Sequence, residues 1–210
     1  MLDNTLQTNA AIFYTRYKDL IRSQVLPFTN QFGVTTQETV NVNAGESEAY
    51  GVELEAIWVP TSNLAVDFSV SWLQHDYREF DLDTNGDGIF EDLSNLDVPY
   101  SPEWKAVVGV TYDQYLTDGH GSITWNTSLN YQAEAETSVF EPTFSEMESR
   151  KLWDANVTWR DQDEKYRVTF WAKNLLDETH RIGANSVAGL WNFTAYGRPR
   201  SLGVEFGVRF

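Results

Sequence analysis

The sequence predicts an all-β chain that supplies about eight strands of an antiparallel transmembrane β-barrel. Apolar residues recur at every second position rather than with the helical period of 3.6, which indicates strands with one apolar and one polar face. These alternating segments last for about ten residues, the length needed to cross a bilayer at a steep tilt, whereas soluble strands have about five or six. The connections between them alternate between short and long.

The plainest alternation predicts a strand at residues 50–58. Its apolar face is formed by Tyr50, Val52, Leu54, Ala56 and Trp58, and its other face by Gly51, Glu53 and Glu55. A turn rich in Pro, Ser and Asn separates it from the next strand. Further strands are expected at 64–72, 104–112, 123–131, 153–159, 166–172 and 201–210. A first strand is expected at 6–22, with its facing left open because Ala10–Tyr14 is a continuous run.

The connections predict which end of each strand faces which compartment. Short connections are expected at 60–63, 116–121 and 161–164, and long ones at 27–46, 81–101, 133–149 and 175–198. Outer-membrane barrels have tight periplasmic turns and long outer loops. Nothing requires such alternation in a soluble β-sandwich. With this parity the last strand ends on the periplasmic side.

Aromatic residues favour the same interpretation. The chain has 8 Trp, 10 Tyr and 12 Phe, although its mean hydropathy is only -0.43. Transmembrane barrels place aromatic rings in a girdle at each membrane interface and keep a polar lumen. Rings near strand ends fit two such girdles: Tyr50, Trp58, Trp72, Trp104, Tyr112, Trp153 and Trp159. A soluble sandwich with an aromatic core is the alternative.

Charge and composition exclude some classes of function. The formal net charge is -16, which disfavours a nucleic-acid partner because phosphate contacts need clustered Lys and Arg. Cations suit such a chain better, although the charge also serves simply to solvate loops. The absence of Cys excludes disulfides and thiolate sites. The sequence has no apolar run long enough for a transmembrane helix, and its first residues lack the pattern of a signal peptide. A protein of the outer membrane must be exported, so we expect its true N-terminus to be missing.

Several motifs together resemble the TonB-dependent receptors of the outer membrane. The chain has Asn-Leu-Leu-Asp-Glu at 174–178, Gly-Arg-Pro-Arg at 197–200 and a last strand that ends in Phe210. Segments 47–55 and 100–105 are also similar to the family. His180 departs from it, because the family often has Tyr there. The resemblance implies that residues 1–210 are the C-terminal segment of a barrel of about twenty-two strands whose plug domain and N-terminal strands are absent here.

The resemblance also carries functional expectations. It implies an outer-membrane receptor of a Gram-negative bacterium for the TonB-dependent uptake of a siderophore or similar large nutrient, of which this fragment alone is not transport-competent. Its partners would be outer-membrane lipid, the barrel-assembly machinery and, through the missing N-terminal region, TonB. Phe206, Val208 and Phe210 would belong to the sorting signal that the assembly machinery reads. A complete small barrel of eight strands is the structural alternative.

One long connection contains a candidate calcium site. Residues 81–92 place oxygen donors at positions 1, 3 and 5, a turn Gly at 6 and a carboxylate at 12, the pattern of an EF-hand loop. The expected ligands of Ca²⁺ are Asp81, Asp83, Asn85, Asp87 and Asp92. Asp92 replaces the usual Glu, and strands rather than helices flank the loop. The alternative is an acidic turn without an ion.

Other residues carry weaker signals. Trp191, Phe193 and Tyr196 in the last long connection are candidate ligand-binding residues, although aromatic loop tips are also common without ligands. His75, His120 and His180 have no metal-ligand spacing, and Glu53, Glu55 and Asp67 are ordinary lumen-facing charges. We therefore predict no catalytic residue and no enzyme, including a glycosidase. The alternative function is that of a soluble calcium-dependent carbohydrate-binding β-sandwich.

Overall fold

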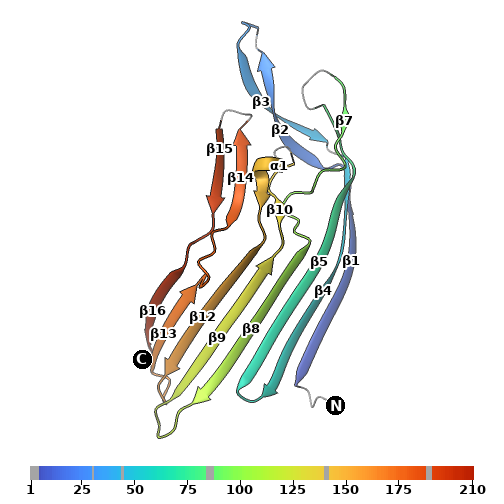
Figure 1. Ribbon diagram of the computed structural model, residues 1–210. Coiled ribbons are helices and arrows are strands. Elements are labelled where there is room, and N and C mark those ends of the chain that lie inside the picture. Colours follow the sequence, from blue (N-terminus) through green and yellow to red (C-terminus); the bar gives the residue numbers. More distant parts are fainter. Residues whose placement is uncertain (1–4, 30, 44, 84–87, 140–141, 188–190) are drawn as a thin grey trace.

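The computed structural model describes residues 5–29, 31–43, 45–83, 88–139, 142–187 and 191–210. It contains one eight-stranded antiparallel sheet that runs in the order β1-β4-β5-β8-β9-β12-β13-β16 (Figure 1). These strands are β1 (Leu6–Tyr17), β4 (Glu46–Thr61), β5 (Leu64–Glu79), β8 (Trp104–Tyr115), β9 (Ser122–Gln132), β12 (Arg150–Arg160), β13 (Tyr166–Lys173) and β16 (Ser201–Val208). Their number and positions confirm the predicted fold class.

The strand register confirms that the predicted apolar faces form one continuous surface. Val52 lies opposite Trp72, Trp72 opposite Trp104, and Val108 opposite Leu129. Phe170 lies opposite Val204 at the other side of the sheet. The register also resolves the facing of β1, because Ile12 lies opposite Val52 and Tyr14 opposite Tyr50. We call the eight-stranded sheet the wall, and we call this surface the apolar face of the wall.

The opposite face of the wall is polar and forms cross-strand hydrogen bonds. Asn126 donates to Thr111 (2.8 Å), and the hydroxyls of Thr158 and Thr169 lie 3.0 Å apart. Such pairs between directly opposed residues stabilise a sheet modestly. A polar face of this kind suits the lumen of a barrel, whereas the apolar face suits lipid.

The two ends of the wall differ as the sequence predicts. At one end the strands are joined by tight turns, such as Thr61 to Leu64, and Asp118 and Glu164 adopt positive φ there. At the other end each long connection contains a small hairpin that the sequence did not reveal: β2 (Ile21–Thr29) with β3 (Thr35–Asn43), β6 (Asp81–Leu82) with β7 (Glu91–Asp92), β10 (Ala135–Glu136) with β11 (Glu146–Met147), and β14 (Arg181–Val187) with β15 (Trp191–Tyr196). We call this end the outer rim. Within the described residues no helix is long and apolar enough to cross a membrane, and α1 (Pro142–Ser145) is a single turn.

Two strand ends differ from the prediction. The first strand stops at Tyr17 rather than at residue 22, and Ile21 already belongs to the β2–β3 hairpin. Asp19 adopts a left-handed φ of 55°, which an extended strand cannot include, and Leu20 donates to the carbonyl of Gly45 (3.0 Å). The last strand ends at Val208, two residues before Phe210.

The sheet is open in the described part of the chain. β1 pairs only with β4, and β16 pairs only with β13. The two edge strands lie at opposite sides of the sheet in Figure 1. Their outer backbone groups therefore lack a ladder partner, a state that neither lipid nor water tolerates well along a whole strand.

Candidate functional site at the outer rim

A small hydrophobic core holds the outer rim together. Phe80 is fully buried, and its ring centroid lies 4.6 Å from that of Tyr77. Leu82, Val98 and Val139 complete the buried cluster, which we call the rim core. Its members come from β5, the β5–β8 connection and the β9–β12 connection, and Leu20 of the β1–β4 connection packs against them. This packing therefore fixes the connections relative to one another. Burying a side chain of the size of Phe contributes about 1.5–3 kcal/mol.

The Asn-Leu-Leu-Asp-Glu motif forms a turn that Asn174 closes. Asn174 is 5% exposed and adopts a φ of 51°, which Asn tolerates better than most residues. Its Oδ1 accepts from the backbone N–H of Glu178 (2.9 Å), while its Nδ2 donates to the carbonyls of Glu178 (2.9 Å) and Arg198 (3.2 Å). The side chain therefore ties the outer end of β13 to the chain that enters β16.

The acidic residues around this turn extend the same attachment to neighbouring strands. The carboxylate of Glu178 accepts from the backbone N–H of Lys151 on β12 (3.0 Å). Asp177 accepts from the backbone N–H of Arg200 (3.0 Å), and Asp154 accepts from that of Asn174 (2.9 Å). The motif is thus a structural junction of β12, β13 and β16, and its acidic residues hold backbone groups rather than a ligand.

His180, where the chain departs from the resembling family, is part of this junction. It is 8% exposed, and a Cβ atom placed at Gly197 would collide with its ring. Gly197 also donates its backbone N–H to the carbonyl of His180 (2.9 Å). The glycine of the Gly-Arg-Pro-Arg motif is therefore needed for close packing against the histidine.

An acid-lined cavity of about 530 Å³ opens in the rim above the outer end of β8. It lies between β5 and β9, because β5 continues past the level at which β8 begins. Six carboxylates line it, and no Lys or Arg does: Asp76, Asp97, Glu103, Glu134, Glu136 and Glu146. Three of them accept hydrogen bonds: Asp76 from Gln74, Glu103 from Trp72, and Glu136 from Ser145. The cavity therefore presents negative potential that favours cations over anions.

His75 lies at the edge of this cavity between two serines. Its Nε2 is 3.1 Å from the hydroxyl of Ser47, and its Nδ1 is 2.9 Å from that of Ser101. Ser47 is 1% exposed. Since one ring nitrogen of a neutral histidine donates and the other accepts, the two serines satisfy the ring and link β4, β5 and the β7–β8 connection.

The candidate calcium ligands are only partly described. Asn85 and Asp87 lie outside the described residues. Asp81 and Asp92 are directly opposed in the β6–β7 pair, so that their side chains share one side of the ribbon. Asp83 accepts from the backbone N–H of Gly88 (2.8 Å). Among the residues that the structure describes, no group of three or more His, Cys, Asp or Glu is arranged to hold a metal.

Asp92 is held by its neighbour as well. Its Oδ1 accepts from the backbone N–H of Ser94 (2.9 Å). Hydrogen bonds from the side chain and then the backbone of Ser94 lower the pKa of Asp92 below its ordinary value. The carboxylate is therefore charged throughout the neutral range, as a calcium ligand must be.

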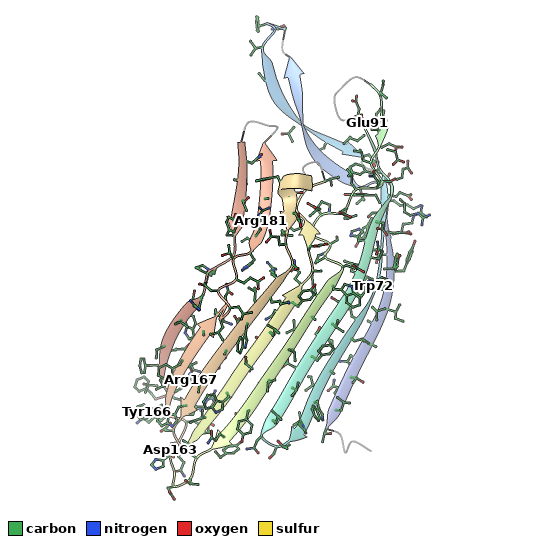
Figure 2. All side chains as sticks on the ribbon, in the orientation of Figure 1. Trp72, Glu91, Asp163, Tyr166, Arg167 and Arg181 are labelled. Carbon is green, nitrogen blue, oxygen red and sulfur yellow. The ribbon has the colours of Figure 1, made fainter. Side chains whose placement is uncertain are left out.

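The aromatic candidates of the last connection are exposed but do not converge. Phe193 is 46% and Tyr196 56% exposed, and both lie on β15. They are three positions apart, so strand alternation directs them to opposite faces of the ribbon. The side chain of Trp191 lies outside the described set. Arg181, labelled in Figure 2 at the start of β14, donates to the carbonyl of Glu146 (3.1 Å) and so joins this hairpin to β11.

The lumen-facing carboxylates form no site of their own. Glu53, Glu55 and Asp67 lie on the polar face of β4 and β5, where they have no hydrogen-bond or ion-pair partner within the described part of the chain. They do not meet across a cleft, as a glycosidase would require.

Comparison with known proteins agrees with the fold. The family model described as the β-barrel of TonB-dependent receptor-like proteins matches residues 1–175. No curated protein sequence matches the chain. Residues 176–210, which hold the rest of the junction and β16, lie beyond the family match.

Solved structures extend the likeness to the whole chain. The ferric yersiniabactin uptake receptor FyuA from Yersinia pestis is 18% identical with a TM-score of 0.73, and the alignment covers 99% of this chain and 28% of that one. The siderophore receptor PiuA from Acinetobacter baumannii is 20% identical with a TM-score of 0.67, at 97% and 26% coverage. The ferric-catecholate import receptor Fiu from Escherichia coli K12 is 20% identical with a TM-score of 0.63, at 97% and 25% coverage. The chain thus spans roughly a quarter of these receptors, and the likeness concerns their fold.

Proposed function

Because the chain belongs to the TonB-dependent receptor family, we propose that it forms the C-terminal part of the barrel wall of a receptor that imports a siderophore or a similar large nutrient. The family and the similar structures are outer-membrane β-barrel receptors and transporters. The observation that carries the proposal is the open eight-stranded wall with tight turns at one end and hairpins at the other, which superposes over almost its full length on iron-chelate receptors.

The open edges support a role within a larger barrel. A strand edge in lipid must be paired, and β1 and β16 each have one unpaired side in the described structure. The remaining strands and a plug domain would complete the lumen in this proposal. Contact with TonB would then belong to a part of the receptor outside these residues. The exposed apolar side chains of Phe206, Val208 and Phe210 fit the proposed signal for the barrel-assembly machinery.

The uptake function is testable with the complete receptor that contains this chain. Cells that carry the receptor should bind a radioactive ferric siderophore at the surface and import it only when TonB is present. Removal of the β14–β15 ribbon (181–196) should lower binding more than it lowers the amount of inserted barrel, if Phe193 and Tyr196 contact the ligand. Surface binding that is unchanged by the deletion would exclude those residues. Absence of uptake for every iron chelate tested would contradict the siderophore proposal.

A second proposal concerns the predicted calcium loop. We propose that residues 81–92 bind Ca²⁺ at the outer rim. Two like charges that face each other across a ribbon repel, and a cation between Asp81 and Asp92 would relieve that repulsion. Leu82 is 2% exposed and belongs to the rim core, so the base of the loop is already anchored. The ion would therefore act on the loop above this base rather than on the whole connection.

Calcium titration of the receptor in detergent, followed by calorimetry, separates the two outcomes. The intact receptor should bind one Ca²⁺ that the double substitution Asp81→Asn with Asp92→Asn abolishes. Asp163→Asn, in a tight turn at the other end of the wall, serves as the charge-matched control and should leave binding unchanged (Figure 2). Equal binding by all three proteins would place any calcium elsewhere.

A further inference from the structure

The glycines within the wall strands all lie on the polar face, and each lies directly opposite a larger side chain. The pairs are Gly51 with Phe13, Gly109 with Asp67, Gly203 with Trp171 and Gly207 with Arg167. A Cβ atom placed at the first three glycines would collide with the opposite side chain, and one placed at Gly207 would lie 3.3 Å from Nε of Arg167. Each glycine therefore leaves a hole in the polar face that the opposite side chain fills. We call these four pairs the filled holes.

Two of the filled holes lie on β16, the strand at one edge of the wall (Figure 1). The indole ring of Trp171 on β13 occupies the space that a Cβ atom at Gly203 would need. Arg167, labelled in Figure 2, lies over Gly207 and forms an ion pair with Glu205. Within the described structure β16 pairs with β13 alone, so the contacts with β13 set its alignment.

The alternation of apolar and polar residues does not fix the register of β16. A slip by one residue would turn its apolar side chains to the polar face, whereas a slip by two residues restores the facing. Leu202, Val204 and Phe206 are spaced two residues apart, and any of them can lie opposite Phe170 without exposing a polar group to the apolar face. A feature other than polarity must therefore select the observed register, in which Val204 lies opposite Phe170.

The filled holes occur between strands that no tight turn aligns. A tight turn fixes the register of the two strands that it joins, as it does for β4 with β5, β8 with β9 and β12 with β13. Long connections join β1 to β4, β5 to β8 and β13 to β16, and these are the three strand pairs that contain the filled holes. A long connection also joins β9 to β12, and there the side chain of Asn156 donates to that of Asn126 (3.4 Å) instead. This distribution indicates that the filled holes take over the aligning role of a turn.

Charge opposes one slip of β16 by two residues but favours the other. If Glu205 lay opposite Trp171, then Arg209 would lie opposite Arg167, and the two like charges would repel. If Ser201 lay opposite Trp171, then Glu205 would lie opposite Arg167, which charge favours. In this second slip the indole ring would meet the side chain of Ser201 in place of a hole. The collision, and not charge, opposes that slip.

We propose that Trp171 is a positioning residue whose ring, seated on Gly203, selects the register of β16. The register decides where the Gly-Arg-Pro-Arg segment meets the junction, because Arg200 donates its backbone N–H to Asp177 in the observed alignment (3.0 Å). It also sets the position of the outer edge of β16, with which a further strand of the complete barrel would pair. Only this last point rests on the proposed function, since the alignment of β16 with β13 is internal to the chain.

The test uses the complete receptor in the outer membrane and determines the register from disulfide formation. Residues 1–210 contain no Cys, so two cysteines introduced on the apolar face of a receptor without other cysteines report which residues lie opposite each other. Phe170→Cys with Val204→Cys reports the observed register, and Phe170→Cys with Leu202→Cys reports the slipped one. Mass spectrometry of the digested protein then gives the amount of each disulfide-linked peptide.

The receptor with native Trp171 should form the first disulfide in large excess over the second. Trp171→Ala should raise the ratio of slipped to observed register by a factor on the order of ten, because forcing a side chain into filled space costs at least that much. The reciprocal variant, Trp171→Gly with Gly203→Trp, moves the ring to the other strand and should restore the native ratio. Thr169→Ala is the control and should leave the ratio unchanged, since Thr169 lies opposite Glu205 rather than a glycine.

Each other outcome has a definite meaning. The observed register in every variant would overturn the inference while leaving the membrane receptor intact. An equal rise of the slipped register in Thr169→Ala would also overturn it, because the loss of any contact would then loosen the strand. If Trp171→Ala does not insert, the reciprocal variant decides: insertion in the observed register supports the inference, and failure to insert overturns it. A receptor that is absent from the outer membrane even with native Trp171 would instead contradict the proposed function.

Discussion

Apolar side chains are exposed on the wall but buried in the outer rim. Ile12 and Phe206 on the wall are 84% and 76% exposed, although each belongs to the continuous apolar face. In the rim, Phe80 is fully buried within a core drawn from the end of β5 and two connections. The wall exposes its apolar residues because its proposed solvent is lipid, whereas the rim stands in water and must bury them. The comparison teaches that one chain carries surfaces suited to two solvents, and the change between them falls near the contacting rings of Tyr50, Trp72 and Trp104.

Phe80→Ala tests the rim half of this comparison and has the largest expected effect. Removing a buried Phe from a core costs about 3–5 kcal/mol. In the complete receptor the loss should raise hydrogen exchange in the part of the rim core outside the wall strands, around Leu82, Val98 and Val139, while the wall strands keep their protection. Phe90→Ala, at a side chain that is 68% exposed, is the control and should change little. Faster exchange in β4 and β5 would mean that the rim also stabilises the wall.

Leu129→Arg tests the wall half. The side chain lies in the middle of the apolar face, opposite Val108 and Trp153. An Arg at the midplane of a lipid-facing surface costs about 2–4 kcal/mol. Its neighbour Asn130 has the opposite facing, so Asn130→Arg should cost far less. Both free energies of unfolding can be measured by urea titration of the receptor in lipid vesicles. Equal costs for the two variants would show that the apolar face does not contact lipid.

Asn174→Ala probes the junction between wall and rim. The substitution removes three hydrogen bonds and places Ala at a φ of 51°, so we expect a local cost of about 1–3 kcal/mol. Limited proteolysis of the connection between β13 and β16 should become faster, and Asn174→Asp should be intermediate because it keeps the acceptor for Glu178. If proteolysis is unchanged, the junction is held by Asp177 and Glu178 rather than by Asn174.

Ser94→Ala has the smallest expected effect and depends on pH. Ser94 lowers the pKa of Asp92, so the charged carboxylate favours the folded turn above the pKa of an unfolded aspartate, about 3.9. This contribution is lost as pH falls through the lower pKa of the folded state. In the variant the turn should open at a higher pH than in the parent, as measured by exchange of the amide at position 94 relative to the unfolded peptide. An identical pH dependence of exchange in both proteins would show that Ser94 does not cause the lowered pKa of Asp92.

The wall could be predicted from sequence because lipid and lumen impose opposite requirements on alternate residues. The facing of Tyr50, Leu54 and Trp58 follows from that alternation alone, and the register confirms it. The first strand was predicted too long because a positive φ at Asp19, not polarity, ends it. The calcium ligands, the ligand-binding aromatics and the sorting signal remain predictions.

The rim could not be predicted in the same way. Phe80 and Leu82, Val98, and Val139 lie in three separate stretches of the sequence with no common period, so nothing local marks them as one core. The four small hairpins lack the long alternation that identifies the wall strands. The sequence shows only that His180 lacks metal-ligand spacing and departs from the family's usual Tyr, yet the side chain is buried against Gly197. A histidine and a glycine separated by sixteen residues become neighbours only through the β14–β15 pairing.

Hydrogen exchange on the edge strands tests the central claim most directly, that this chain is part of the wall of a larger barrel. The chain refolded alone in detergent micelles should show rapid exchange of the outward-directed amides in β1 and β16, slow exchange in β8 and β9, and no heat-dependent shift on a gel. In the complete receptor the same edge amides should be protected. Protected edges together with a heat-dependent shift in the isolated chain would mean that it closes as a small barrel by itself, and would contradict the account.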